Sequence, residues 1–369
     1  MDENKEKSIK NAEKQQLRAY IPIGAPLNWE PTEGSEPDMR LVVSFTVKWL
    51  NKRMGLDYTQ RFHTDPVHRF SILSRLKSEI KKAFPEIPYF FEHGEEELNT
   101  ISGVYGVCFM PMLYGLPAQY SPHDWPNMKY GRHLSEEQIK NLKPFEPENN
   151  PFMEAFLKQL ELMETLYGPI DGYTNFQGVL NTAFRVRGND IFTDMTDDPG
   201  FAGYLFEHVA DTTEKAAKLI QRRQRESGFY ADSFCSSNCV VNMVSPVDYE
   251  KFILPHDTRL SQQFKLYGMH TCNWVVDPYV ENIKKIERLE YLDFGFASNL
   301  ETIGREFKNT RKNVFYNPIF LMQKSWDEIK NDAEYIKRTI SPCDICLSDI
   351  DDSVSDKLIN KFAELINSL

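Results

Sequence analysis

The tetrapeptide Met269-His270-Thr271-Cys272 places two metal-binding side chains two residues apart, directly after the strand-like run FKLYG. In extended backbone, side chains at positions i and i+2 point to the same face, so His270 and Cys272 can converge on one atom. An imidazole with a thiolate is typical of zinc and is softer than any Mg²⁺ or Ca²⁺ site. The alternative is a chance H-x-C triplet in which Cys272 is only a small buried hydrophobe.

Two ligands do not hold zinc, and the next cysteines along the chain are Cys343 and Cys346. Cys343 comes at the end of another predicted strand, and ligands from separate strand ends are typical of catalytic rather than structural zinc. His270 and Cys272 are therefore candidate metal ligands, and Cys343 or Cys346 is the candidate third ligand. A redox role for the C-x-x-C pair is less favoured, because no helix is predicted to start there.

The chain has six cysteines in 369 residues, too few for a disulfide scaffold. Cys235 and Cys239 form a C-x₃-C after another predicted strand, where we expect wall or core positions more than ligands. Cys108 lies inside the apolar run VYGVCFMP and is predicted to be core.

Two aspartates, Asp232 and Asp293, lie near predicted strand ends and are the candidate catalytic carboxylates. Either one can be a metal ligand, a partner that orients His270, or a general base. The structural alternative is that each caps the next helix or turn.

Substrate-binding candidates are polar or aromatic residues that follow predicted strands or lie in the long loop Met112–His133. Amides can hydrogen-bond a ligand but are also common turn formers, and the aromatic loop can be a binding wall or pack onto the barrel. The predicted substrate-binding residues are Asn175, Gln177, Asn181, Asn238, Tyr114 and Trp125, with His123 and Tyr130 as further aromatic candidates.

Short apolar runs alternate with amphipathic stretches, which indicates a mostly parallel sheet. The predicted strands are Ile87–Phe91, Val104–Phe109, Pro169–Asn175, Phe229–Cys235, Phe264–Met269, Leu289–Phe294, Asn313–Asn317 and Arg338–Cys343. The predicted helices include Asn150–Tyr167, Asp198–Gly228 (with one break), Asp248–Gln263, Asp277–Glu287, Leu300–Asn309, Ser325–Arg338 and Ser353–Leu369.

Eight strands of this kind predict a (β/α)₈ TIM barrel, an α/β fold, with an N-terminal helical extension. A doubly wound sheet is the alternative, but no Gly-rich phosphate loop occurs. We expect residues 1–16 to be a frayed tail and residues 17–369 to form a single barrel domain.

The charge balance is 43 Lys+Arg against 54 Asp+Glu, a net charge of −11. This argues against a nucleic-acid or anionic-membrane partner, since both need a basic field. No apolar run is long enough to span a bilayer and the N-terminal residues lack a signal-peptide core, so we expect a cytoplasmic protein.

The stretch from about Gly168 to Cys343 resembles the uroporphyrinogen decarboxylase superfamily of (β/α)₈ barrels, most closely its corrinoid-dependent (methylcobamide–thiol) methyltransferase branch. The segments that carry the resemblance are GPIDGYTNFQGVLNTAF, FTDMTDDPGFAGYLFEHV, ADSFCSSNCVVNMVSPVDYEKFILP, KLYGMHTCNW and TISPCDI. The resemblance implies a Zn²⁺ held by His270, Cys272 and Cys343. It also implies methyl transfer between a corrinoid on a carrier protein and a thiol or methylated small molecule, in either direction.

One position departs from the family pattern. Relatives tend to place a carboxylate ligand near the position of Phe296 here, and Asp293 is close but out of register. Two alternatives remain open: decarboxylation of a tetrapyrrole, and a non-catalytic barrel that binds a corrinoid or its carrier. The region IPIGAPLNWEPTEGSEPDMR lacks the close arginine pair of the decarboxylases, and an acidic chain suits an octa-acidic substrate poorly.

Overall fold

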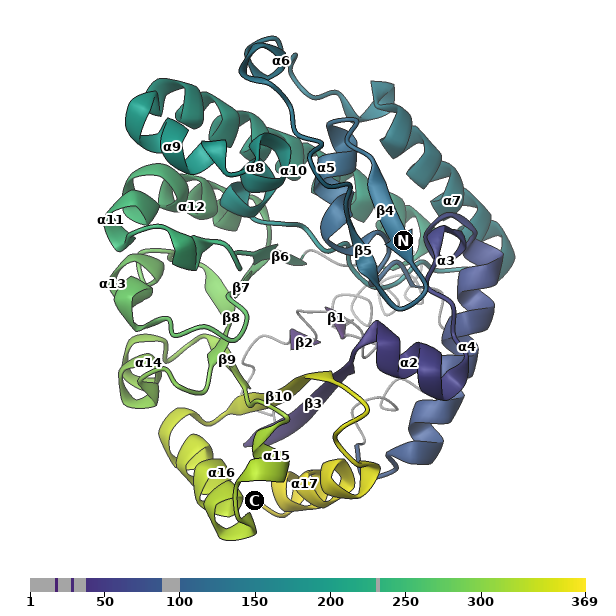
Figure 1. The fold of residues 1–369 in the computed structure, drawn as a ribbon, viewed down its shortest axis with the longest axis vertical. Helices are drawn as coiled ribbons and strands as arrows, with labels where there is room; N and C mark the ends of the chain where they lie inside the picture. Colours follow the sequence, from purple (N-terminus) through teal and green to yellow (C-terminus); the bar gives the residue numbers. More distant parts are fainter. Residues whose placement is uncertain (1–16, 19–27, 30–37, 88–99, 230–232) are drawn as a thin grey trace, which may run out of the picture.

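The computed structural model describes residues 17–18, 28–29, 38–87, 100–229 and 233–369. Its centre is a six-stranded parallel sheet in the order β3-β10-β9-β8-β7-β6. Figure 1 shows these strands curving around a centre, with the helices outside them. The strands are β3 (Met39–Phe45), β6 (Ser233–Ser237), β7 (Leu266–His270), β8 (Leu289–Gly295), β9 (Arg311–Phe315) and β10 (Cys343–Ile350).

Two further segments extend this curved sheet beyond β6. Gln177 forms a parallel bridge with Ser237 of β6, and Asp171 forms another with Thr100. Parallel strands joined through outer helices are the TIM-barrel arrangement. The predicted α/β, TIM-barrel-like fold is therefore confirmed.

The helices cover the outside of the sheet (Figure 1). In the first half of the chain they are α2 (Val47–Met54), α3 (Gln60–Thr64), α4 (Pro66–Ala83), α5 (Phe109–Leu113), α6 (Glu136–Lys140), α7 (Pro151–Tyr167), α8 (Val179–Arg187) and α9 (Asp190–Asp197). In the second half they are α10 (Pro199–Ser227), α11 (Pro246–Asp248), α12 (Leu254–Gln263), α13 (Val280–Ile283), α14 (Leu300–Glu306), α15 (Phe320–Gln323), α16 (Trp326–Ile340) and α17 (Asp356–Ser368). None of the helices in the described part of the chain combines the length and apolar character that a bilayer crossing requires.

Most residues ahead of the sheet, where a helical extension was predicted, lie outside the described residues. The described residues before the sheet are β1 (Leu17–Arg18) and β2 (Asn28–Trp29), which pair antiparallel. β3 is itself a barrel strand that pairs with β10, and the helices α2, α3 and α4 come after it.

Helix starts were predicted well because their signals are local. Ser325 and Glu328 form the expected capping box of α16, and Asp198 caps α10 with Pro199 in its first turn. The expected break in the second of these helices is absent, since α10 runs unbroken over 29 residues.

Strand predictions had mixed outcomes. β7 and β8 match their predicted runs closely, whereas Val104–Phe109 is a tight helical turn leading into α5. The predicted strand Arg338–Cys343 is also wrong: α16 continues to Ile340, and β10 begins at Cys343. The predicted strand Ile87–Phe91 lies almost wholly outside the described residues.

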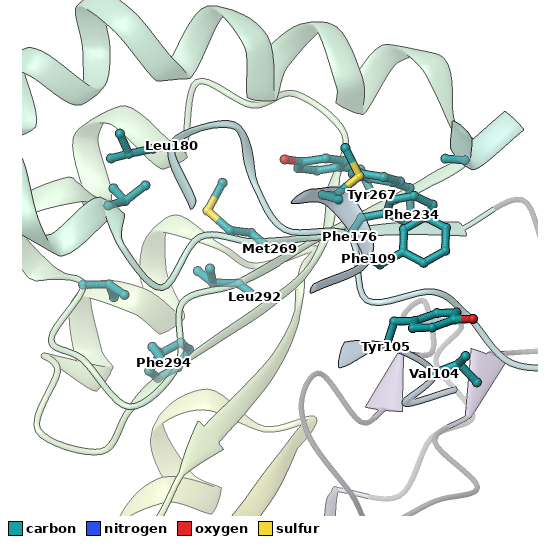
Figure 2. Packing of buried hydrophobic residues seen from close by; sticks show 14 of the residues in the cluster. Val104, Tyr105, Phe109, Phe176, Leu180, Phe234, Tyr267, Met269, Leu292 and Phe294 are labelled. Carbon is teal, nitrogen blue, oxygen red and sulfur yellow. The ribbon is translucent and has the colours of Figure 1, made fainter. Parts of the chain in front are cut away.

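The apolar side chains that the strands present outward pack against the helices, and the inward side chains include both polar and apolar residues. Phe234, Tyr267, Met269, Leu292 and Phe294 belong to the main hydrophobic cluster between strands and helices, as Figure 2 shows. Their neighbours in sequence alternate to the opposite face, which is the inside of the barrel. The alternation places His270 of β7 and Asp293 of β8 on that inner face.

Inside the barrel, Asp344 of β10 lies between two arginines, Arg40 of β3 and Arg311 of β9. The Asp344 carboxylate accepts from Arg40 Nε at 2.8 Å and from Arg311 Nη2 at 2.7 Å, and all three residues are buried. We call these three residues the salt-bridge triad. It joins three neighbouring strands through one carboxylate.

The aromatic loop Met112–His133 contains an antiparallel hairpin, β4 (Ala118–Ser121) and β5 (Asp124–Met128). Trp125 of this hairpin packs near Tyr58, with ring centroids 6.3 Å apart. The indole also lies against the backbone of Gly103 and Gly106. Part of the loop thus packs onto the barrel, as the structural alternative held.

Candidate metal centre

Three soft ligand side chains converge at the C-terminal ends of β6 and β7. The ligand atoms of Cys239, His270 and Cys272 all lie within 4.8 Å of one another. His270 is buried, and the two cysteines are partly buried. We call these residues the thiol–imidazole cluster.

Strand register explains why the two cysteines meet. Ser237, the last residue of β6, pairs with His270, the last residue of β7. Cys239 and Cys272 each lie two residues beyond those paired positions, so adjacent turns carry them to the same place. Cys272 has a positive φ of 64°, a conformation that is rare for a residue with a side chain and is frequent at functional sites.

Amides hold the turn that carries Cys239. The Asn238 backbone N–H donates to the His270 carbonyl at 2.7 Å, and the Asn238 side chain donates to buried Asp257 at 2.9 Å. Asn181 Oδ1 accepts from the Val240 backbone N–H at 2.8 Å. These bonds fix the backbone on both sides of Cys239 and tie it to the end of β7.

Asp293 of β8 orients the histidine. Its Oδ2 accepts from His270 Nδ1 at 2.6 Å, and its Oδ1 accepts from the backbone N–H groups of Thr271 at 2.7 Å and Cys272 at 3.1 Å. Because Nδ1 is engaged, His270 Nε2 is the nitrogen left for a metal. A carboxylate behind a metal-binding histidine fixes the ring and makes the free nitrogen a better donor.

The cluster favours negative charge on sulfur. A hydrogen bond from the Cys239 thiol lowers the pKa of Cys272 against the effect of burial, and the nearby imidazole adds to this. The same hydrogen bond, together with burial, raises the pKa of Cys239. Burial, the largest single effect, lowers the pKa of His270, but the charges of Asp293, Cys239 and Cys272 and the hydrogen bond to Asp293 together raise it.

The donor set fits a zinc-type ion. Two thiols and one imidazole are the soft and borderline donors that zinc selects, and three protein ligands leave a coordination position open for catalysis. The cluster contains the predicted ligands His270 and Cys272, and its third member is Cys239, whereas Cys343 was the predicted third ligand.

Cys343 lies at the wrong end of the barrel to join this cluster. It is the first residue of β10, whereas His270 is the last residue of β7 in the same parallel sheet. Its side chain packs in the main hydrophobic cluster, and burial raises its pKa to about 12. Cys346 faces the inside of the barrel, where it packs with Val42 and Phe315.

The remaining cysteines have the expected surroundings. Cys108 is buried in the core, and burial raises its pKa to about 12. Cys235 is also buried, packing with Phe229 and Tyr291 inside the barrel.

The predicted substrate-binding amides form a network beside the cluster. Gln177 donates to Asn175 and accepts from Asn181, and Asn175 also accepts from the Ser237 hydroxyl at 2.9 Å. Their observed hydrogen bonds are thus to other protein groups, as expected if these amides stabilise turns. Substrate contact by Asn175, Gln177, Asn181 and Asn238 stays a prediction.

The other predicted site residues lie apart from the cluster. Tyr114 bonds to His208 at 3.0 Å and to Thr212 at 3.2 Å, both on α10. Trp125 packs in the hairpin described above. Asp232 lies outside the described residues.

A cavity of about 230 Å³ opens beside Cys272, and sequence reasoning missed most of its wall. It lies over the C-terminal ends of β9 and β10. Its lining residues are Cys272, Asn273, Phe315, Tyr316, Asn317, Pro318, Ile319, Met322, Ser348, Asp349, Asp351, Ser353 and Val354. The polar run SDIDDS at the end of β10 could have indicated this wall. It was missed because the last strand was predicted to end at Cys343, whereas β10 begins there.

Fold and site together define a TIM-barrel-like protein with a soft-donor cluster at the C-terminal face, where such barrels place their active sites. Among solved structures, the chain resembles a methyltransferase from Methanosarcina mazei. The two share 12% sequence identity, with a TM-score of 0.60 over 98% of this chain and 96% of that one. No family model and no curated protein matches the sequence.

Proposed function

We propose that this protein is a zinc-dependent methyltransferase that moves a methyl group between a corrinoid on a carrier protein and a small thiol. The observation that carries the proposal is the convergence of Cys239, His270 and Cys272 at the C-terminal face. The overall likeness to a solved methyltransferase supports it, as does the resemblance of the segments around His270 to corrinoid-dependent enzymes.

Each residue of the centre has a distinct task. Cys239, Cys272 and His270 Nε2 would hold the ion, and Asp293 keeps the imidazole oriented and its Nδ1 protonated. When bound, zinc lowers the pKa of a coordinated thiol and so supplies a thiolate at neutral pH.

The buried arginines do not favour the decarboxylase alternative. Arg40 and Arg311 lie inside the barrel, but both are bonded to Asp344. Guanidinium groups already paired with a carboxylate are poorly placed to receive the carboxylates of a tetrapyrrole.

Metal content is the first test. We expect about one zinc per chain in protein purified without chelator, measured by mass spectrometry of the metal. His270→Ala, Cys272→Ala and Cys239→Ala should each lose most of it while circular dichroism stays unchanged. Zinc-free wild-type protein that cannot be loaded with zinc would contradict the proposal.

The second test follows the reaction. Methylcob(III)alamin with a panel of thiols should show a zinc-dependent change in its visible spectrum as the methyl group leaves cobalt. The Cys272→Ala variant is the control, and we expect its rate to fall at least about a thousandfold. A zinc-loaded protein that causes no change with any thiol would favour the non-catalytic barrel.

A further inference from the structure

The cavity beside Cys272 is lined by acidic side chains. Among its lining residues in the described part of the chain, the formally charged side chains apart from the thiol are Asp349 and Asp351. We propose that this cavity binds the small thiol substrate through a positively charged group on it, such as an ammonium. This inference rests on the proposed function and names the substrate class of the same site.

The cavity is continuous with the metal centre. Cys272 belongs both to the thiol–imidazole cluster and to the cavity wall. Phe315, another wall residue, has its ring centroid 5.7 Å from that of His270. A molecule with its sulfur at the metal end therefore extends toward the C-terminal end of β10, where Asp349 lies in the strand and Asp351 directly after it.

The acidic end of the cavity is held in shape by its backbone. Asp349 has a positive φ of 57°, and its N–H donates to the Ser44 hydroxyl at 3.2 Å. The Ser348 hydroxyl donates to Asp349 Oδ2 at 3.2 Å. Non-glycine residues in this conformation cluster at ligand sites, and Cys272 at the other end of the same cavity shares it.

No lysine or arginine among the described residues lines the cavity to offset these carboxylates. Lys324 lies over the ring of Tyr316, 5.5 Å from its centroid, but its ammonium is bonded to Asp332. An anionic thiol would thus meet two carboxylates without a compensating cation. A cationic one gains charge attraction and can lie against the Phe315 ring in the cavity wall.

The volume fits a small ligand. A cavity of about 230 Å³ is below the range of roughly 300–1,000 Å³ typical of drug-sized ligands. An aminothiol with a short carbon spacer suits both the size and the two unlike ends of the cavity.

The chemical step leaves the cationic group unchanged. The substrate S–H proton leaves to solvent, the thiolate sulfur forms a bond to the methyl carbon, and the cobalt–carbon bond breaks with its electron pair remaining on cobalt. The methyl-corrinoid is the methyl donor, so no further oxidant or reductant is needed. The ammonium serves binding only.

The test measures binding separately from turnover. Calorimetry on zinc-loaded protein would compare three thiols with the same two-carbon spacer: 2-aminoethanethiol, 2-sulfanylethanol and 3-sulfanylpropanoate. We expect 2-aminoethanethiol to bind about tenfold more tightly than 2-sulfanylethanol, and 3-sulfanylpropanoate to bind weakest. Asp349→Asn and Asp351→Asn should each reduce the ammonium preference about threefold or more.

Asp352→Asn is the matched control. It removes the same charge one residue from Asp351, but its carboxylate pairs with Lys52 and is not part of the cavity wall. We expect this variant to keep the full preference.

The outcomes separate the two proposals. Thiols that bind with no charge preference, or best as the anion, overturn this inference and leave the proposed function standing. A preference that survives in both cavity variants overturns it as well. If no thiol binds the zinc-loaded protein at all, the proposed function fails and this inference fails with it.

Discussion

Two buried clusters inside the barrel use titratable side chains in opposite ways. In the salt-bridge triad, both oxygens of Asp344 accept hydrogen bonds from Arg40 and Arg311, and the three side chains are sealed from solvent. In the thiol–imidazole cluster, two sulfurs and one ring nitrogen face one another beside a cavity.

The difference separates a structural cluster from a candidate functional one. A buried charge is tolerated when an opposite charge and hydrogen bonds compensate it, as in the triad. In the thiol–imidazole cluster, Asp293 compensates the imidazole alone, and the two sulfurs face each other and that imidazole. Three soft donors this close together are suited to binding a cation. The adjoining cavity leaves room for a further ligand of that cation.

The largest expected effect is the loss of stability when the salt-bridge triad is broken. Asp344→Asn removes the buried carboxylate charge that Arg40 and Arg311 share, so we expect a loss of about 3–5 kcal/mol in the free energy of unfolding. Urea unfolding measures it, and the exposed pair of Lys52 and Asp352 is the control, where Asp352→Asn should change stability little. The folded fraction of Asp344→Asn should still bind zinc. Equal stability of both variants would contradict a structural role for the triad.

The triad also sets a pH dependence. Burial alone would raise the pKa of Asp344, but the two guanidinium groups outweigh it and lower the pKa from 3.8 to about 2. A depressed carboxyl pKa stabilises the folded state above the unfolded-state value, and this contribution is lost as the pH falls from 3.8 toward 2. The difference in stability between wild type and Asp344→Asn should therefore shrink over that range.

A smaller effect, on zinc affinity, is expected from the carboxylate that orients His270. Asp293→Asn replaces the carboxylate that holds His270 Nδ1 and two backbone N–H groups, so we expect zinc affinity to fall about 10- to 100-fold. Competition with a chromophoric chelator measures the affinity. An unchanged circular dichroism spectrum would show that the variant is folded and that the loss of zinc affinity is not due to unfolding. Unchanged affinity would mean that Asp293 acts elsewhere than on the histidine.

The smallest effect sharpens which cysteine is the third ligand. Cys343→Ala should keep full zinc content and cost about 1 kcal/mol of stability, because its thiol packs in the core. Cys239→Ala is its matched opposite and should lose zinc. The reverse pattern would restore Cys343 as the ligand.

Much of the site was predictable because its signals are local. His270 and Cys272 stand out by spacing alone, and the partner role considered for Asp293 agrees with its bond to His270. Cys239 was undervalued because β6 was predicted to end at Cys235, whereas it ends at Ser237. Aligning SFCSSNC with LYGMHTC, as the strand register does, places the last cysteines of both runs together.

The errors elsewhere also arise from strand boundaries. The apolar run Val104–Phe109 is short, and periodicity alone does not distinguish a short strand from a buried helical turn. Moving the start of β10 to Cys343 shifts this cysteine from one end of the barrel to the other. Pairing of β3 with β10 is set by contacts across most of the chain, which no local pattern reveals.

That long-range pairing has a consequence for the order of assembly. Arg40 and Asp344 are separated by 304 positions, so β3 and β10 can meet only after nearly the whole chain is available, at a high cost in loop-closure entropy. The residues of the candidate metal centre and their supporting carboxylate all lie between Ser233 and Gly295, on three consecutive strands or in the turns directly after them. The candidate ligands are therefore brought together by strands that are close in sequence. Pairing of β6, β7 and β8 can precede the pairing of β3 with β10.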